Sequence, residues 1–275
     1  MESDTSDDSS RGHDNDFTQS LLKSLQSQQQ MRKFTDFVII VNGESIPAHR
    51  NIISAACPYF RMMFESHMKE EIDNEVRLDN LDVVSVKQIV DYLYTGNISV
   101  AVDSVDRLFE ACDFLLLDDL KKKCTLFIIN QINAQNCISW YRFATLYQME
   151  DIIHPARFCM RYEFSAVTES QEFMNMTYIE LVDFVTDDQL HVRNEDPVVA
   201  GCIKWVEYDL EERCQYLISL LLKLPLRYCS TKYLHHVMGQ ITPDGAWCGG
   251  AQQPPAPVRS AEGTNGRNKR SKSSR

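Results

Sequence analysis

Apolar residues near the start of the chain recur at intervals of three and four positions. This spacing is typical of one face of a helix, and it predicts a helix over residues 17–28. The apolar positions that define this face are Phe17, Leu21, Leu22 and Leu25.

The spacing then changes to that of strands. Residues 37–41 are continuously apolar and mostly β-branched, in a run too short for a helix. Asn42 and Gly43 follow, and this pair is the strongest two-residue signal for a β-hairpin. Residues 44–48 are therefore expected to return as a second strand.

Helical spacing dominates from residue 51 to about residue 130. Two further short strands are expected at 75–78 and 98–100, and Gly96 is placed for a left-handed helix end. Short strands among helices predict an α+β domain, with helices around a small sheet, over residues 17–130. The helical stretches are 51–68, 83–94, 105–116 and 120–128.

The second half of the chain shows helical stripes and no convincing strand. An all-α domain is therefore expected over residues 131–239. Residues 240–275 are rich in glycine, proline, serine and basic residues, and residues 1–16 are acidic and rich in serine. Both ends are expected to be disordered tails, because neither can bury enough apolar surface to fold.

Charge is distributed unevenly along the chain. The 28 basic and 39 acidic residues give a net charge of 28 − 39 = −11. Residues 1–16 carry six acids and one base, whereas residues 252–275 carry six bases and one acid. The acidic surplus argues weakly against nucleic-acid binding, because phosphate groups require a basic surface. The basic tail is compatible with nuclear import, with a weak nucleic-acid contact or with a merely solubilising role.

Nine cysteines are present, each at least 12 positions from the next, and no Cys-x-x-Cys pair occurs. Several lie on apolar helix stripes, where free thiols behave as small buried hydrophobes. The start of the chain does not resemble a secretory signal, and no apolar run approaches the length of a membrane span. The sequence predicts a reduced, cytoplasmic protein without membrane contact, with the nucleus as the alternative that the basic tail allows.

The motifs of common enzyme classes are missing from the sequence: phosphate loops, dinucleotide-binding glycines, nucleophile elbows and zinc-protease helices. His49 and Cys57 could be imagined as a base and a nucleophile, but Cys57 has only apolar neighbours, which favours structural roles for both. The acidic stretch of residues 65–75 lacks the alternation of a calcium loop, which favours a solvated charged loop. A partner interface is the one functional use that this stretch still suits. No catalytic residue, metal site or cofactor is predicted.

Several motifs in order resemble the BTB/POZ domain and then the BACK domain of BTB–BACK–kelch proteins, including gigaxonin. The BTB-like motifs are Asp36-Phe37-Val38, Ile46-Pro47-Ala48-His49-Arg50, Ala55-Ala56-Cys57-Pro58-Tyr59-Phe60, Tyr92-Leu93-Tyr94-Thr95-Gly96 and Cys112-Asp113-Phe114-Leu115. The BACK-like motifs are Asn136-Cys137-Ile138, Phe143-Ala144, Glu172-Phe173, Trp205-Val206 and Leu224-Pro225-Leu226.

The resemblance implies a homodimer formed through the BTB domain, recruitment of cullin-3, and pairing with other BTB–kelch proteins. Met68-Lys69-Glu70 matches the family's hydrophobic-x-Glu cullin motif. The residues that the resemblance places in the cullin contact are Phe64, Met68, Glu70, Asn136 and Phe143. Those that it places in the dimer interface are Phe17, Leu21, Leu22, Leu25, and Asp36 with Arg50 as a buried charged pair.

Kelch blades of about 50 residues are expected in this family, and the residues after Met238 are too few for a propeller. The leading hypothesis is therefore a non-catalytic homodimeric adaptor of a cullin-3 RING ubiquitin ligase in protein degradation, seen as a short form or a partial sequence. The alternative is a BTB interaction module in transcriptional or cytoskeletal organisation that needs no cullin.

Overall fold

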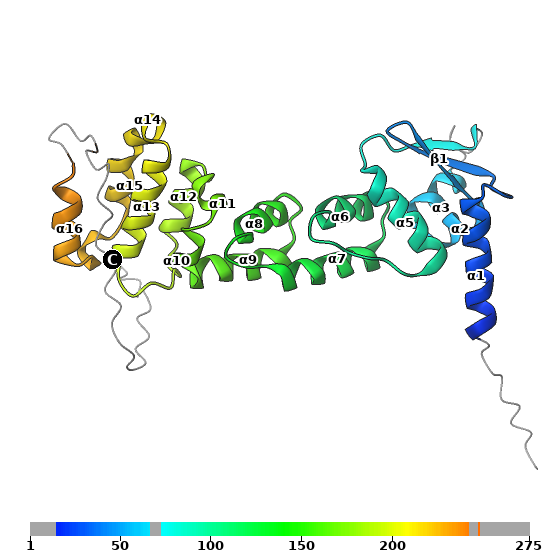
Figure 1. Cartoon of the computed structure of the whole chain (residues 1–275), viewed down its shortest axis with the longest axis horizontal. Coiled ribbons are helices and arrows are strands. Elements are labelled where there is room, and N and C mark those ends of the chain that lie inside the picture. The colour runs from blue at the N-terminus through cyan, green and yellow to red at the C-terminus, as the bar shows by residue number, and fades with distance from the viewer. Residues whose placement is uncertain (1–14, 67–72, 242–246, 248–275) are drawn as a thin grey trace, which may run out of the picture. The chain divides into compact units, whose positions relative to one another are not determined.

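The computed structural model describes residues 15–66, 73–241 and 247 of the 275. The chain divides into two compact units, residues 1–128 and 129–275. The first contains a small sheet among helices and the second is helical (Figure 1). The expected α+β domain and the all-α domain that follows it are thus confirmed.

The hairpin forms where the sequence predicts it. Strand β1 (Phe37–Val41) pairs antiparallel with β2 (Glu44–Ala48), and Val41 lies opposite Glu44. Asn42 and Gly43 have φ values of 49° and 84°, so both turn residues adopt the left-handed conformation of a type I′ hairpin. Glycine at the second position avoids the steric cost that most residues would meet there.

A third strand completes the sheet on the other side of β1. Strand β3 (Glu75–Arg77) runs parallel to β1, which gives the strand order β2-β1-β3. The predicted strand at residues 98–100 is wrong, since these residues form no strand and pair with none. Alternating apolar residues favour a strand only where a sheet edge is available to pair with them.

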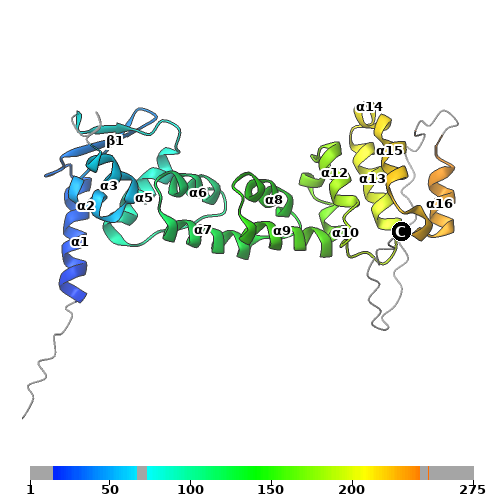
Figure 2. The same cartoon turned by 180° about the vertical axis from the view of Figure 1, so that it is seen from behind.

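Helices complete the first unit. They are α1 (Asn15–Gln30), α2 (Arg50–Ala56), α3 (Pro58–Glu65), α5 (Val83–Thr95), α6 (Val105–Phe114) and α7 (Asp118–Gln131), which crosses the unit boundary. Both views show α2 and α3 on one side of the sheet (Figures 1 and 2). Asp82 caps the start of α5, and Gly96 ends it at φ 69°, as its position predicts.

The second unit is a succession of helices around one apolar core. The helices are α8 (Cys137–Leu146), α9 (Glu150–Tyr162), α10 (Phe164–Val167), α11 (Gln171–Met174), α12 (Tyr178–Val185), α13 (Asp196–Tyr208), α14 (Leu210–Arg213), α15 (Leu217–Lys223) and α16 (Thr231–Met238). Short 3-10 turns lie at Cys214–Tyr216 and Leu226–Tyr228. Trp205 and Phe173 are among the fully buried side chains of this core.

The packed part of the second unit continues past Met238. Ile241 forms an isolated antiparallel bridge with Trp247, and both side chains pack against the apolar core. The Trp247 indole N–H donates to Glu207 Oε1 on α13 at 3.0 Å. Two residues that the sequence places in the basic tail thus belong to the packed unit. Within the described ranges, no helix is both long and apolar enough to cross a membrane.

Candidate partner-binding site

Helix α3 is held firmly at its start and at its end. Pro58 occupies the first turn, where its missing N–H costs no hydrogen bond. The Cys57 thiol donates to the Leu115 carbonyl oxygen at 3.3 Å, which fastens the start of α3 to the end of α6. At the other end, the Ser66 hydroxyl donates to the Met63 carbonyl oxygen at 2.8 Å. The first of these bonds anchors α3 to another helix, and the second closes the last turn of α3 itself.

Phe64 lies in the last turn of α3 and is half-buried. Its ring meets the Phe37 ring edge-on at 4.9 Å, and the Arg50 guanidinium lies over it at 4.5 Å. These contacts tie the end of α3 to β1 and α2. Met68 and Glu70, the two other residues of the predicted cullin contact in this unit, fall outside the described residues.

An apolar patch lies on the outer face of α3. It consists of Tyr59 and Met62, one helical turn apart, together with Phe114 at the end of α6, and is called the α3–α6 patch below. The Tyr59 and Phe114 ring centroids are 5.2 Å apart, Met62 is 51% exposed and Phe114 is 42% exposed. An exposed cluster of aromatic and methionine side chains is typical of protein interaction sites.

The α3–α6 patch was not predicted from the sequence. Phe60 and Met63 form the buried stripe of α3. Met62 lies beside that stripe, and an apolar residue there was the one sequence signal that could have indicated an exposed apolar surface. Phe114 lies 55 positions from Tyr59, and only the fold brings the two rings together.

Helix α1 is fixed to the first unit mainly through its last turns. The Gln29 amide donates to the Pro47 carbonyl oxygen at 2.8 Å, and the Gln26 amide donates to Asp91 Oδ1 at 3.5 Å. Of the predicted dimer residues, Phe17 is 67% and Leu21 48% exposed, whereas Leu22 and Leu25 are half-buried. The apolar face of the first turns is therefore largely exposed in the single chain.

The predicted pair of Asp36 and Arg50 meets at the start of α2. Asp36 Oδ1 accepts from the Arg50 backbone N–H at 2.8 Å and so satisfies a free donor at the beginning of that helix. The Arg50 guanidinium also donates to Asn74 Oδ1 at 3.3 Å. In the single chain Asp36 is exposed and Arg50 half-buried, so burial of the pair stays a prediction about the dimer.

His49 and Cys57 have structural contacts in the interior. The Tyr94 hydroxyl oxygen accepts from the His49 backbone N–H at 2.9 Å and lies 2.8 Å from Nδ1, while Nε2 lies 3.2 Å from the Lys33 carbonyl oxygen. Burial raises the pKa of the Cys57 thiol, which disfavours the nucleophilic thiolate. In the described part of the chain, no group of three or more His, Cys, Asp or Glu side chains could hold a metal ion.

In the second unit, the predicted contact residues lie at the start and the middle of α8. Asn136 is half-exposed, and its amide closes the turn before α8 by donating to the Gln131 carbonyl oxygen at 2.9 Å and accepting from the Asn133 N–H at 2.8 Å. Phe143 is half-exposed between the rings of Trp140 and Tyr147, at 5.6 Å and 4.8 Å.

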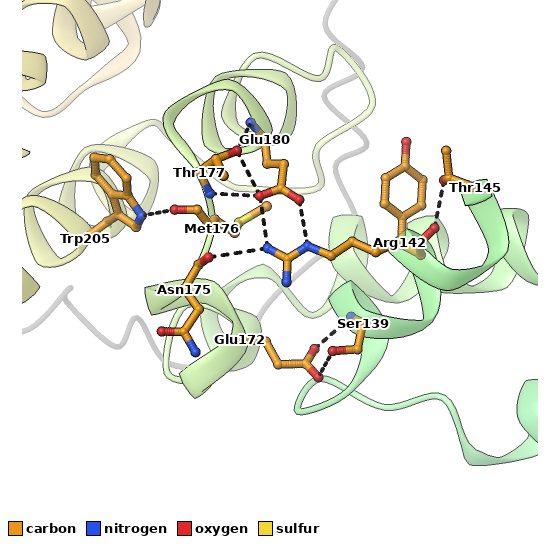
Figure 3. Close-up of polar contacts among 10 residues, drawn as sticks. Ser139, Arg142, Thr145, Glu172, Asn175, Met176, Thr177, Glu180 and Trp205 are labelled. Atoms are coloured by element: carbon orange, nitrogen blue, oxygen red, sulfur yellow. Dashed lines mark hydrogen bonds and ion pairs between the residues drawn. The ribbon is translucent and has the colours of Figure 1, made fainter. Parts of the chain in front are cut away.

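Another face of α8 is anchored to the segment around α11 and α12 (Figure 3). Arg142 donates twice to Glu180, from Nε to Oε1 at 2.6 Å and from Nη2 to Oε2 at 2.9 Å. Ser139 donates to Glu172 through its backbone N–H, at 3.0 Å, and through its hydroxyl. These contacts fix the orientation of α8 within its unit.

Comparison with known proteins agrees with this architecture. Residues 25–132 match the BTB/POZ domain family, and residues 137–239 match the family described as BTB And C-terminal Kelch, abbreviated BACK. The chain is a BTB–BACK protein, homologous to the kelch-like proteins. Its 275 residues contain no kelch repeats.

Several relatives share both domains with this BTB–BACK chain. It is 34% identical over 206 residues to Kelch repeat and BTB domain-containing protein 2 of Homo sapiens. The aligned region covers 75% of this chain and 33% of that protein. It is 31% identical to Kelch-like protein 28 of Homo sapiens, over 79% of this chain and 38% of that protein. The chain thus spans about a third of the length of these relatives.

Among solved structures, the BTB domain of human gigaxonin is 29% identical to this BTB–BACK chain. The match covers 46% of this chain and 98% of the gigaxonin domain, with a TM-score of 0.36.

Proposed function

We propose that this BTB–BACK chain is a non-catalytic adaptor that dimerises through its BTB domain and recruits cullin-3 to a ubiquitin ligase. The family supports this role, because kelch-like BTB–BACK proteins are typically cullin-3 adaptors and generally not enzymes. His49 and Cys57, the residues most suggestive of chemistry, are committed to structural contacts, which is consistent with a binding function.

The α3–α6 patch is the observation that carries the proposal. It joins Tyr59 and Met62 of α3 to Phe114 of α6. The Cys57 thiol anchors α3 at its start, and the Phe64 ring anchors it at its end. Met68-Lys69-Glu70 begins two residues after Ser66, where α3 ends. A methionine adapts to apolar partner surfaces, and a glutamate accepts charge-assisted hydrogen bonds, so patch and motif together suit a helical partner.

A pull-down of the amino-terminal part of cullin-3 tests this role. Met68→Ala/Glu70→Ala and, separately, Met62→Glu are each expected to reduce cullin-3 recovery by about 30-fold or more, as expected for the loss of interface hot spots. Val84→Glu on α5 is a matched control, since Val84 is 57% exposed and lies on another helix of the same unit. This control should bind like the wild type.

The outcomes separate the competing functions. Equal recovery by the wild type and by Met68→Ala/Glu70→Ala would remove the motif from the interface. Absence of cullin-3 from the wild-type sample would contradict the adaptor role. It would instead favour a BTB interaction module that works in transcriptional or cytoskeletal organisation without cullin.

A further inference from the structure

A concave surface in the second unit lies between the start of α12 and the segment around α14, and is called the α12–α14 groove below. Its volume is about 570 Å³, a size within the range of ligand-binding clefts. It is lined by two short stretches of chain and one tryptophan: residues 175–178, Glu211, Glu212, Arg213, Gln215, Tyr216 and Trp205.

Aromatic rings form one side of the α12–α14 groove. The rings of Tyr178 and Tyr216 are stacked, with centroids 4.6 Å apart and planes inclined by 21°. The Tyr178 hydroxyl lies 3.0 Å from the Ser219 hydroxyl, which holds the pair in place. Tyrosine rings attract ammonium and guanidinium groups through their electron-rich faces, so this side suits a basic side chain.

Free carboxylates lie beside these rings. Glu211 and Glu212 are exposed, and among the described residues neither carboxylate is paired with a basic side chain. Asp209 adds a third negative charge nearby, where its carboxylate accepts from the Glu212 backbone N–H at 3.3 Å. The rim of the groove therefore carries an excess of negative charge.

Among the described residues that line the groove, Arg213 is the one basic residue, and its guanidinium contacts neutral groups. Arg213 Nη1 donates to the carbonyl oxygens of Met174 and Trp205, at 2.8 Å and 3.1 Å. Its guanidinium also lies 4.2 Å from the centre of the Trp205 ring. Arg213 keeps its positive charge, but Glu211 and Glu212 exceed it, so the lining carries a net charge of −2 + 1 = −1.

The same chain contains a segment of matching charge. Residues 252–275 carry six bases and one acid and lie outside the described residues. Their connection to the groove is short, because Trp247 is bound to Glu207 of α13, the helix that also supplies Trp205. Lys269 follows Trp247 by 22 residues, a span whose mean end-to-end distance as a flexible chain is about 25 Å.

We infer that the basic C-terminal segment docks into the α12–α14 groove of its own chain. A tether of this length gives an effective concentration in the millimolar range, so a contact with a dissociation constant of about 1 mM or below is populated. Ion pairs with Glu211 and Glu212 and cation–π contacts with the tyrosine rings contribute to it together. The segment then occupies the groove as an internal ligand. Any partner that uses the groove must displace it, and such a partner must itself present basic side chains.

Limited trypsin digestion of the full chain tests the docking, because trypsin cleaves after the lysines and arginines of the tail. A synthetic, isotope-labelled peptide of residues 252–275 in the same tube reports the cleavage rate of the undocked sequence. At low salt, the tail of the intact chain is expected to be cut about three- to tenfold more slowly than the peptide, which corresponds to a docked state populated about 70–90% of the time. Mass spectrometry of the released fragments gives both rates.

Matched variants locate the contact. Glu211→Gln/Glu212→Gln keeps the shape of both side chains and is expected to abolish the protection. Glu150→Gln/Asp151→Asn removes two exposed carboxylates from the first turn of α9 in the same unit and should leave the protection unchanged. Raising the salt concentration from about 0.02 M to about 0.5 M shortens the screening length from about 20 Å to about 4 Å and should also abolish it.

Three results would overturn the inference. The first is equal cleavage rates for the tail and the free peptide. The second is a control variant that loses as much protection as the groove variant. The third is protection that grows with protein concentration, which would assign the contact to a second copy of the chain.

Discussion

Arg142 and Glu180 form a two-point ion pair between α8 and α12, with Nε–Oε1 and Nη2–Oε2 distances of 2.6 Å and 2.9 Å. Glu180 is also the third residue of a capping box, in which its carboxylate accepts from the Thr177 backbone N–H at 2.8 Å. One carboxylate thus stabilises the start of α12 and binds α8 to it. Since α8 carries Phe143, this pair orients a predicted partner-binding residue.

The Arg142–Glu180 pair should give the second unit a defined acid sensitivity. Hydrogen bonds from Arg142 lower the pKa of Glu180 to about 2. A carboxylate with a lowered folded-state pKa stabilises the fold above its unfolded pKa of about 4.3, and this stabilisation is lost as the pH falls toward about 2. Glu180→Gln should therefore cost about 1–2 kcal/mol at pH 6, since both side chains are about one-third exposed, and almost nothing near pH 2.

Urea unfolding of the wild type and Glu180→Gln between pH 2 and pH 7 measures this difference, with hydrogen exchange of α12 peptides to locate it. Glu169→Gln is the matched control, because it breaks the ion pair between Glu169 and Lys204 in the same unit. Glu169 is 69% exposed, so this pair is more accessible to solvent than the Arg142–Glu180 pair. The cost of Glu169→Gln should stay below about 0.5 kcal/mol at every pH. If Glu180→Gln lowers the free energy of unfolding by the same amount at every pH, the charge of Glu180 does not stabilise the contact.

Tyr94→Phe should destabilise the first unit. The change removes the hydroxyl that accepts from the His49 backbone N–H and contacts His49 Nδ1, and both groups are buried. Leaving two buried polar groups without partners costs about 2–4 kcal/mol. Tyr92→Phe on the same helix should change the free energy of unfolding by less than about 0.5 kcal/mol, because Tyr92 is half-exposed.

Hydrogen exchange of α5 and β2 peptides measures the local free energy of opening for both tyrosine variants. This local measurement is preferable to a global midpoint, since a chain of two units need not unfold in one step. Equal protection in Tyr94→Phe and Tyr92→Phe would contradict a structural role for the Tyr94 hydroxyl.

Local signals predicted much of the fold, because the physics behind them is local. Asn42 and Gly43 tolerate positive φ, and Gly96 ends α5 for the same reason. The apolar periodicity of the second unit predicted helices, since burying one face of a helix needs no particular pairing partner. The failed strand at residues 98–100 shows the limit, because a strand needs an edge supplied from elsewhere in the chain.

The binding surfaces were less accessible from sequence. Periodicity places Phe64 on an apolar stripe, but it cannot show that the ring lies between Phe37 and Arg50. The contact of Tyr59 with Phe114 depends on how α3 and α6 pack, which the sequence pattern does not specify. Asn136 was predicted as a contact residue, and the structure adds that its amide closes a turn. Roles that depend on long-range contacts therefore require the structure.

Cys229 should react slowly with alkylating reagents in the folded protein. Burial, with added repulsion from Asp196 and Glu195, raises the pKa of its thiol to about 11. Only about one molecule in a thousand then carries the reactive thiolate at pH 8. Asp196→Asn removes one of the repelling charges while its side-chain oxygen can still accept from the Ser230 N–H, so labelling of Cys229 should become several-fold faster.

Iodoacetamide labelling at pH 8, followed by peptide mass spectrometry, gives the rate for each cysteine. Cys202 is the internal control, because it is fully buried and should stay unlabelled in both proteins. Faster labelling of Cys202 in Asp196→Asn would show that the variant opens the fold. Unchanged labelling of Cys229 would mean that burial alone protects the thiol.

Leu21→Glu should break the proposed dimer. Leu21 is 48% exposed on the face of α1 that carries Phe17, so in a dimer the variant would bury one unpaired carboxylate from each chain. Each buried charge costs several kcal/mol, which corresponds to a dissociation constant raised on the order of a thousandfold or more. Sedimentation velocity at micromolar concentration should then show two chains per particle for the wild type and one for Leu21→Glu.

Met62→Glu is the reciprocal control for Leu21→Glu, because it places the same charge on the α3–α6 patch of the same unit. It should sediment as a dimer and fail to recover cullin-3, whereas Leu21→Glu should still bind cullin-3 as a single chain. Dimeric sedimentation of Leu21→Glu would remove the first turns of α1 from the interface. Loss of both properties in either variant would instead indicate that the dimer and the cullin-binding surface depend on each other.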